Sequence, residues 1–442
     1  FHFANGTFAF QACLFLIAGF FALLLTTGLY TRFSTFMSWL LLTSLHIRNP
    51  MVLQGGDDLL RLLLFWSMFL PLGLWGSIDS LKSKQKRQGG YQSCSLATAA
   101  LILQIASMYA FTMIHKWHPY WYDSYIAGEQ ALRIDQFTSR LGYVLLQYPE
   151  LLQFFTHLTV ATEWAAPILL LSPFFIRESR FFACILLIGF HLLGLQLLMY
   201  LGLFPWICAT AWVALLPGGF WDFPLVRRGV TAVTGRISHI FNSVAKVIPD
   251  FQISWSVHEK LKHSLLSIMW IAKNTFIAVC LLYVLAWNVR EVDPERLLTY
   301  FPRSANWFGR SLRIDQRWSM FSPKPLSEDG WYIIPGKLRD GSEVNVFDPD
   351  SSITFDKPDL VSETYPGQRW RKYMMNLWMK KHSKHRLYYG KYLCRSWNAQ
   401  KRLDKQLITF QIIFMKEVTL PDGSEAKPEE TILWNHSCFN SS

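Results

Sequence analysis

Residues 94–114, CSLATAALILQIASMYAFTMI, form a run without a single charged side chain. A helix needs about 20 predominantly apolar residues to cross the hydrocarbon core of a bilayer. The run leads directly into a basic and aromatic segment, residues 115–121, HKWHPYW. The sequence therefore predicts a membrane-spanning helix with a concentrated group of functional side chains at its exit.

Similar apolar runs recur along the chain, and 51% of its 442 residues are hydrophobic. The other runs cover 8–29, 33–46, 58–76, 151–174, 181–202, 204–217 and 264–287. We expect the short runs 33–46 and 204–217 to be tilted or shielded by neighbouring helices. The predicted fold class is a membrane all-α helical bundle of about eight apolar helices, followed by a small mixed α+β soluble domain.

The same pattern divides the chain into four parts. Residues 1–217 form the transmembrane bundle, 218–263 a basic amphipathic connection on the cytoplasmic membrane surface, 264–287 the last transmembrane helix, and 288–442 the soluble domain. We also expect a further stretch before Phe1, because the chain enters an apolar run within a few residues. The lipid bilayer is the predicted partner. Nucleic acid is not, because no nucleic-acid-binding motif accompanies the net charge of +12.

Lysine and arginine residues indicate the orientation, because they collect in short cytoplasmic loops. Alternate crossings place most basic loop residues on one side: Arg32, Lys82, Lys84, Lys86, Arg87, Arg177, Arg180, Arg227, Arg228, Arg236, Lys246, Lys260 and Lys262. The loops on the other side balance their basic residues with acidic ones. We therefore expect the 115–150 loop and the soluble domain to lie outside the cytoplasm.

The soluble domain shows signals for both strands and helices. Residues 331–334, 344–347 and 407–418 are rich in Ile, Val and aromatic side chains, which favour strands. Residues 369–381 predict a basic helix that carries aromatic residues. None of the seven cysteines forms a C-x-x-C pair, which argues against a thiol–disulfide oxidoreductase. Cys394 and Cys438 share this domain, and a disulfide between them depends on an oxidising compartment.

Charged side chains at the edge of apolar runs are functional candidates, because burying them in a membrane is costly. Asp57 and Asp58 open the run at 58–76, and Arg61 follows on the same helical face. We expect Arg61 to pair with one of the two carboxylates. Two interpretations are open, a helix cap with an ion pair at the membrane edge or the lining of an internal cavity.

Lys116 lies at the exit of the 94–114 helix, where a lysine usually extends towards the interface. A partly desolvated lysine can instead act as a base, and His115 and His118 are near enough in sequence to relay protons. Glu163 and His191 lie inside other apolar runs. A hydrogen bond to a neighbouring helix is the ordinary role of such a histidine. No second ligand follows at metal-binding spacing, so no metal site is predicted.

These segments together resemble the HTTM (horizontally transferred transmembrane) domain family, which includes vitamin K-dependent γ-glutamyl carboxylase. The resemblance covers most of the chain. It rests on residues 45–50 (LHIRNP) with 55–57 (GGD), 66–73 (WSMFLPLG), 116–121 (KWHPYW), 189–191 (GFH) and 202–206 (GLFPW).

The resemblance also implies a chemistry. In the carboxylase, a lysine shortly before a tryptophan deprotonates reduced vitamin K, and the spacing of Lys116 and Trp121 is similar. The oxygenated quinone removes a γ-proton from a peptide glutamate, and carbon dioxide adds to the carbanion. By this resemblance Lys116 is the base, His191 assists, and the cofactor is reduced vitamin K or a menaquinone-like quinone. His115 is a further catalytic candidate, because it is near enough in sequence to relay protons.

We expect a quinone pocket bounded by the helices that carry His46, His191 and Glu163, with Trp117 and Trp121 as stacking surfaces. The chain departs from the carboxylase in three respects. His115 replaces the lysine that precedes the base, the residues between Lys116 and Trp121 are less acidic, and the soluble domain is much shorter. A second hypothesis therefore stands beside the first, a membrane maturation or export factor that binds a peptide or protein without catalysing a reaction.

Overall fold

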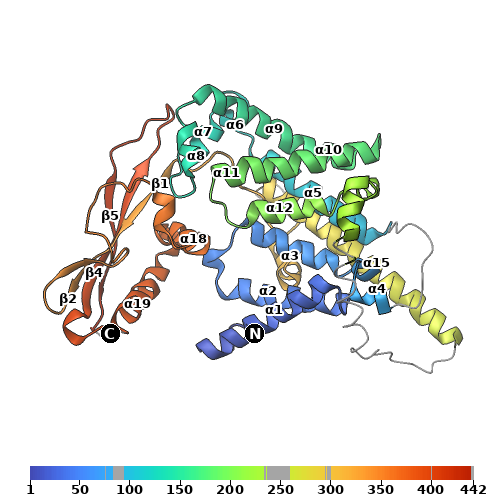
Figure 1. Ribbon diagram of the computed structural model, residues 1–442, viewed down its shortest axis with the longest axis horizontal. Helices are drawn as coiled ribbons and strands as arrows, with labels where there is room; N and C mark the ends of the chain where they lie inside the picture. Colours follow the sequence, from blue (N-terminus) through green and yellow to red (C-terminus); the bar gives the residue numbers. More distant parts are fainter. Residues whose placement is uncertain are drawn as a thin grey trace.

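The computed structural model describes residues 1–74, 76–82, 94–232, 235, 259–293, 295, 300–399 and 401–439. Most helices gather in one body, and a β-sheet lies at the opposite end of the molecule (Figure 1). Helix α18 (Gln368–Leu377) lies between the two (Figure 1). The predicted order, an apolar helical bundle followed by a small α+β region, is confirmed at this level.

Five helices in the described ranges are long and apolar enough to cross a membrane. They are α1 (Phe8–Thr27), α5 (Leu96–His115), α9 (Pro149–Leu171), the continuous stretch Ile176–Leu198 and α15 (Glu259–Val292). The stretch Ile176–Leu198 consists of α10 (Ile176–Gly189), the π-helical turn η3 (Phe190–Leu195) and α11 (Gln196–Leu198). The chain is consistent with an integral membrane protein.

The predicted count of about eight spanning helices is not supported. The runs at 33–46, 58–76 and 204–217 form α2 (Thr31–Arg48), α3 (Gly55–Ser67) and α12 (Phe204–Val213). Helix α2 is too polar, while α3 and α12 are too short. Proline explains the short lengths, because Pro71 follows the end of α3, and Pro205 and Pro217 lie at or beyond the two ends of α12.

The bundle is built around α5, which packs against both α9 and α15. Its core includes Trp39, Trp66, Trp212 and Trp318. Short helices complete this body: α4 (Ile78–Lys82), α6 (Pro119–Tyr122), α7 (Ala127–Leu132), α8 (Arg140–Leu145) and α13 (Gly218–Trp221). Much of the surface of α1 is apolar and exposed, as expected of a helix that faces lipid.

The sheet contains five antiparallel strands. They are β1 (Glu328–Ile333), β2 (Pro335–Leu338), β3 (Glu343–Asn345), β4 (Leu407–Val418) and β5 (Glu429–Ser437). Strands β1 and β2 pair one after the other along one edge of β4, and β5 pairs along the other edge. The region also contains α19 (Lys384–Asn398), whereas α17 (Asn306–Leu312) packs on the bundle, where Phe308 contacts Tyr283 of α15.

The predicted strand 407–418 matches β4, and the predictions at 331–334 and 344–347 overlap β1 and β3. The predicted helix 369–381 corresponds to α18, which ends at Leu377. Cys394 of α19 and Cys438, just after β5, form a disulfide, which the sequence alone did not decide.

Two expectations depend on residues outside the described ranges. Most of the 218–263 connection lies there, as do Lys84, Lys86, Arg87, Arg236 and Lys246. The orientation in the membrane therefore stays a prediction. The domain boundary at residue 288 also stays a prediction, and it falls within α15.

Candidate functional site

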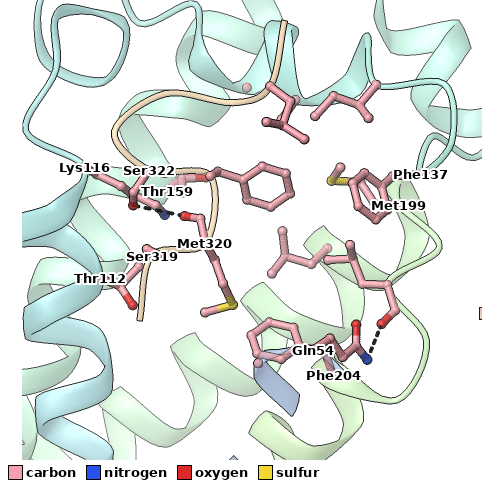
Figure 2. Close-up of a pocket in the computed structure, with 18 of the residues that line it drawn as sticks. Gln54, Thr112, Lys116, Phe137, Thr159, Met199, Phe204, Ser319, Met320 and Ser322 are labelled. Carbon is pink, nitrogen blue, oxygen red and sulfur yellow. Dashed lines mark hydrogen bonds between the residues drawn. The ribbon is translucent and has the colours of Figure 1, made fainter. Parts of the chain in front are cut away.

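A cavity of about 630 Å³ lies where the bundle meets the chain that leads into the sheet. Side chains from α5, α9, η3 and α12 line it, together with residues 319–322 (Figure 2). Met199, Phe137, Phe204 and Met320 give it largely apolar walls (Figure 2). The volume falls within the range of about 300–1,000 Å³ that is typical of small-molecule sites.

Lys116, the residue that follows α5, extends into this cavity and is only 2% exposed. Its Nζ lies 2.6 Å from Oε2 of Glu163 on α9 and 4.4 Å from the centre of the Trp121 ring. His118 caps the next helix by accepting a hydrogen bond from the Tyr120 N–H, and α6 brings Trp121 back beneath the lysine. The prediction that Lys116 faces a pocket is confirmed.

His191 also lines the cavity, from the π-helical turn η3. Its Nε2 lies 2.7 Å from the Tyr109 hydroxyl, which accepts a hydrogen bond from Trp212 Nε1 at 2.7 Å. Because the hydroxyl has a second lone pair as well as its proton, it can either donate to Nε2 or accept from it. Nδ1 is buried and has no hydrogen-bond partner among the described residues. Turns of this π-helical kind are frequent at functional sites.

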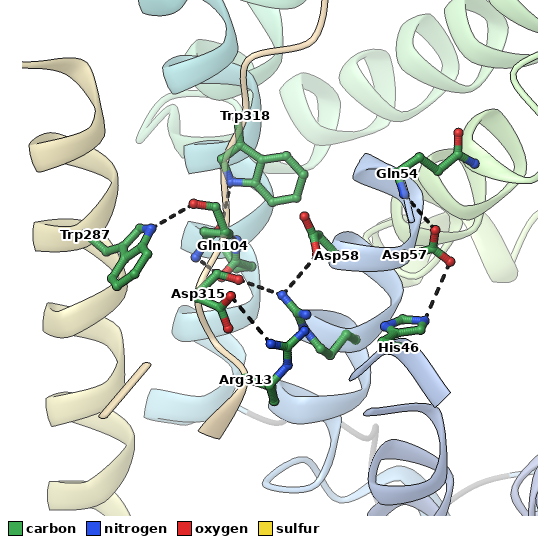
Figure 3. Close-up of polar contacts among 11 residues, drawn as sticks. His46, Gln54, Asp57, Asp58, Gln104, Trp287, Arg313, Asp315 and Trp318 are labelled. Atoms are coloured by element: carbon green, nitrogen blue, oxygen red, sulfur yellow. Dashed lines mark hydrogen bonds and ion pairs between the residues drawn. The ribbon is translucent and has the colours of Figure 1, made fainter. Parts of the chain in front are cut away.

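The structure brings four of the seven candidate residues to one cavity, namely Lys116, Trp121, Glu163 and His191. The other three are not among the described lining residues. Trp117 is 75% exposed and packs against Tyr122, and His115 is half-buried away from the cavity. His46 lies 3.6 Å from Asp57 on the far side of α3 (Figure 3). We expected the helix that carries His46, α2, to form one wall of the cavity. That wall is formed instead by the start of α3, through Gln54, Gly55 and Asp58.

A segment that the sequence analysis did not place forms part of the site. Residues 313–322, here called the strap, follow α17 in the chain. Arg313, Asp315 and Trp318 of the strap lie beside Gln104 and Asp58 in the bundle (Figure 3). Gln104 Nε2 donates to Gln316 Oε1 at 2.7 Å, and the same oxygen accepts from Trp318 Nε1 at 2.6 Å. Trp318 is fully buried. The strap is therefore a wall of the cavity rather than a linker.

Arg61 holds the strap to α3. Its Nη2 lies 3.0 Å from Asp58 Oδ1 and donates to the Asp315 carbonyl at 2.6 Å. The predicted pairing of Arg61 with a neighbouring carboxylate is confirmed. Asp57, the other carboxylate, caps α3 through the Gln54 N–H and binds Arg369 of α18. The sequence left open whether these aspartates cap the helix or line a cavity. Asp57 caps α3, and Asp58 lines the cavity.

Four basic side chains also line the cavity. They come from the strap and the segment after it, Arg317 and Lys324, and from α18, Arg371 and Lys372. Arg371 is buried against the Phe137 ring, 5.1 Å from its centre, and burial lowers the pKa of its guanidinium to about 10. Lys324 and its neighbour Leu326 are exposed, so the cavity reaches the surface there.

Comparison of the chain with family models, curated proteins and solved structures returned no match. The functional argument therefore depends on the cavity itself. It combines apolar walls, a buried lysine–glutamate pair and a buried histidine nitrogen without a hydrogen-bond partner in the described part of the chain, which is the composition of a site for a mainly apolar molecule with polar oxygens.

Proposed function

We propose that this chain is an HTTM-type membrane protein that binds a reduced quinone in the cavity and carries out a γ-glutamyl carboxylase-like reaction. The observation that carries the proposal is the burial of Lys116 with Glu163, Trp121 and His191 around one apolar space. A lysine that only anchored α5 would extend to the interface. The Cys394–Cys438 disulfide favours a non-cytoplasmic soluble domain, because disulfides persist in oxidising compartments.

The lining residues fit a flat molecule with an oxygen at its edge. Trp121 and Phe137 offer aromatic surfaces, and His191 Nδ1 has no hydrogen-bond partner among the described residues, so a quinone oxygen can pair with it when it carries the imidazole proton. A bound reduced quinone would supply two electrons to O₂ and the strong base that takes a glutamate γ-proton, with CO₂ adding to the carbanion, and would end as its epoxide with one water formed.

The residues of this chain supply the first proton acceptor. The Lys116–Glu163 pair is neutral overall either as ammonium and carboxylate or as amine and carboxylic acid. In the second form the amine can take a proton from the hydroquinone hydroxyl, while Glu163 keeps the proton it received. Trp121 covers the ammonium that results and thereby stabilises it.

The test uses membranes that contain the protein, reduced vitamin K, a glutamate-containing peptide and labelled bicarbonate, with mass spectrometry of the peptide. Wild type should place label in side-chain carboxylates, and Lys116→Ala should abolish it. The double variant Lys116→Met with Glu163→Gln removes both charges together and checks that the loss is not caused by an unpaired buried carboxylate. Lys273→Ala is the matched control, because Lys273 is exposed on α15 and lies outside the cavity. Undiminished label in Lys116→Ala would refute the assignment.

A second function, a maturation or export factor that binds a peptide, is favoured by a separate groove of about 230 Å³. Its wall is formed by aromatic side chains of α18 and α19 beside Arg369: Trp370, Tyr373, Tyr388, Tyr389 and Tyr392. Aromatic walls of this kind suit an extended peptide. If wild type incorporates no label, pull-down of peptides that is lost in Trp370→Ala would support this function instead.

A further inference from the structure

Three buried carboxylates meet where the 115–150 loop contacts the sheet. Asp135 follows α7, Asp329 lies on β1, and Glu417 lies on β4 directly opposite Asp329. One carboxylate oxygen from each lies within 4.8 Å of the other two. Like charges placed opposite each other on paired strands are destabilising, so this arrangement requires either a proton held within the group or a compensating positive charge.

Lys357 supplies only part of that charge. Its Nζ lies 2.6 Å from Asp135 Oδ2, 2.6 Å from Glu417 Oε2 and 3.1 Å from Glu425 Oε2. One ammonium therefore faces three buried carboxylates and a fourth that is partly exposed. No other cation in the described part of the chain forms an ion pair with this group. Buried carboxylates without a counter-charge are strongly disfavoured.

The hydrogen-bond partners of the group are also incomplete. Asp329 is only 5% exposed, yet its Oδ2 has no hydrogen-bond partner among the residues that the structure describes. Within the described ranges, Asp135 Oδ2 has only the Lys357 ammonium beside it, at 2.6 Å. The Tyr143 hydroxyl donates to the other Asp135 oxygen at 2.5 Å. The site is thus rich in oxygens and poor in donors, as a hard cation requires.

We infer that Asp135, Asp329 and Glu417 bind a divalent cation of the calcium type. Calcium takes carboxylate oxygens in a flexible geometry, with water completing its coordination. Lys357 occupies the place of the ion in its absence, and Glu425 at the surface receives the ammonium when the ion enters. The ion would fasten the 115–150 loop to the sheet. Because Ile134 and Phe137 on either side of Asp135 line the large cavity, the ion would also stiffen a cavity wall.

Terbium, a luminescent substitute for calcium, provides the test on the full chain in detergent after treatment with a chelator. Tyr143 touches Asp135 and should sensitise the bound ion. We expect saturable luminescence that calcium reverses. Asp329→Asn should weaken binding at least about tenfold, because losing even an indirect contact to an ion costs that much, and Glu417→Gln should do the same. Asp350→Asn, on an exposed acidic residue of the same domain, is the control and should change nothing.

Lys357→Met distinguishes an ion site from a purely internal ion-pair network. If the carboxylates bind calcium, removing the competing ammonium should tighten terbium binding, and calcium should restore the thermal stability of the variant. If the group exists only to hold Lys357, the variant should lose stability that calcium does not restore. That outcome, or terbium luminescence unaffected by Asp329→Asn and Glu417→Gln, would overturn the inference.

Discussion

The ion pair between Asp57 of α3 and Arg369 of α18 joins the soluble domain to the bundle, and mutating it measures how much this contact stabilises the fold. Arg369 Nη2 lies 2.5 Å from Asp57 Oδ1, and Nη1 lies 2.6 Å from Oδ2. Asp57 is buried at the start of α3, whereas the Arg369 side chain is 47% exposed. The carboxylate raises the pKa of the Arg369 guanidinium through these hydrogen bonds. The perturbation is Arg369→Ala, combined with Asp57→Ala in a double-mutant cycle.

Removing one partner of a fully buried pair costs about 3–5 kcal/mol. Two features reduce this figure here. Asp57 keeps the Gln54 N–H, which donates to its Oδ2 at 2.9 Å, and solvent screens the half-exposed guanidinium. We therefore expect a coupling energy of about 1–2 kcal/mol, which corresponds to roughly a 5–30-fold change in the folded-to-unfolded ratio.

The chain contains a matched control. Arg140 of α8 and Glu363 also join the 115–150 loop to the soluble domain by two contacts, at 3.2 and 3.0 Å, but both side chains are exposed. Their coupling should be undetectable, because solvent screens such pairs. The assay is denaturant unfolding in detergent, followed by tryptophan fluorescence. Equal coupling energies for the two pairs, or none for Asp57 with Arg369, would contradict the reasoning.

Three other predictions follow from the fold. Cysteines introduced at Ser124 and Gly341 should react with an impermeant thiol reagent from the same, non-cytoplasmic side; labelling of either only from the cytoplasm would defeat the orientation. Serine at Cys394 and Cys438 should lower the stability of the soluble domain by about 4 kcal/mol, because the bridged loop spans 44 residues; an unchanged midpoint in urea would contradict this. Gly330→Ala should impair folding, because a Cβ would collide with the β4 backbone at φ 148°, whereas Gly341→Ala, with φ 87° but open space, should cost less in the same thermal assay.

Part of the site could be predicted from the sequence, because polar groups are costly to bury in a membrane and therefore mark functional positions in apolar runs. Lys116, Glu163 and His191 each interrupt or end an apolar run, and such groups turn towards a shared interior. Trp117 was misplaced because it is adjacent to Lys116 in sequence, while the turn before Pro119 directs the two side chains to opposite sides. Neighbours in sequence at a helix end do not share a face.

The strap and the carboxylate cluster were beyond sequence reasoning for a different reason. Residues 313–322 have neither helical nor strand periodicity, and Gln316 meets Gln104 across 212 positions. Asp135, Asp329 and Glu417 likewise come from three distant segments that only the folded chain brings together. The number of spanning helices was overestimated because an apolar run does not reveal where a proline ends the helix.

The strap also has a consequence for how the protein is made. A membrane bundle that was complete after residue 217 could assemble while the rest of the chain was still being synthesised. Here the groove for Trp318 stays open until the ribosome has added the 212 residues between Gln104 and Gln316, about 10–40 s at about 5–20 residues per second. During that time Arg61 has no Asp315 carbonyl to bind, and the cavity has no wall on that side. The helices made first therefore cannot complete their packing until the strap has been synthesised.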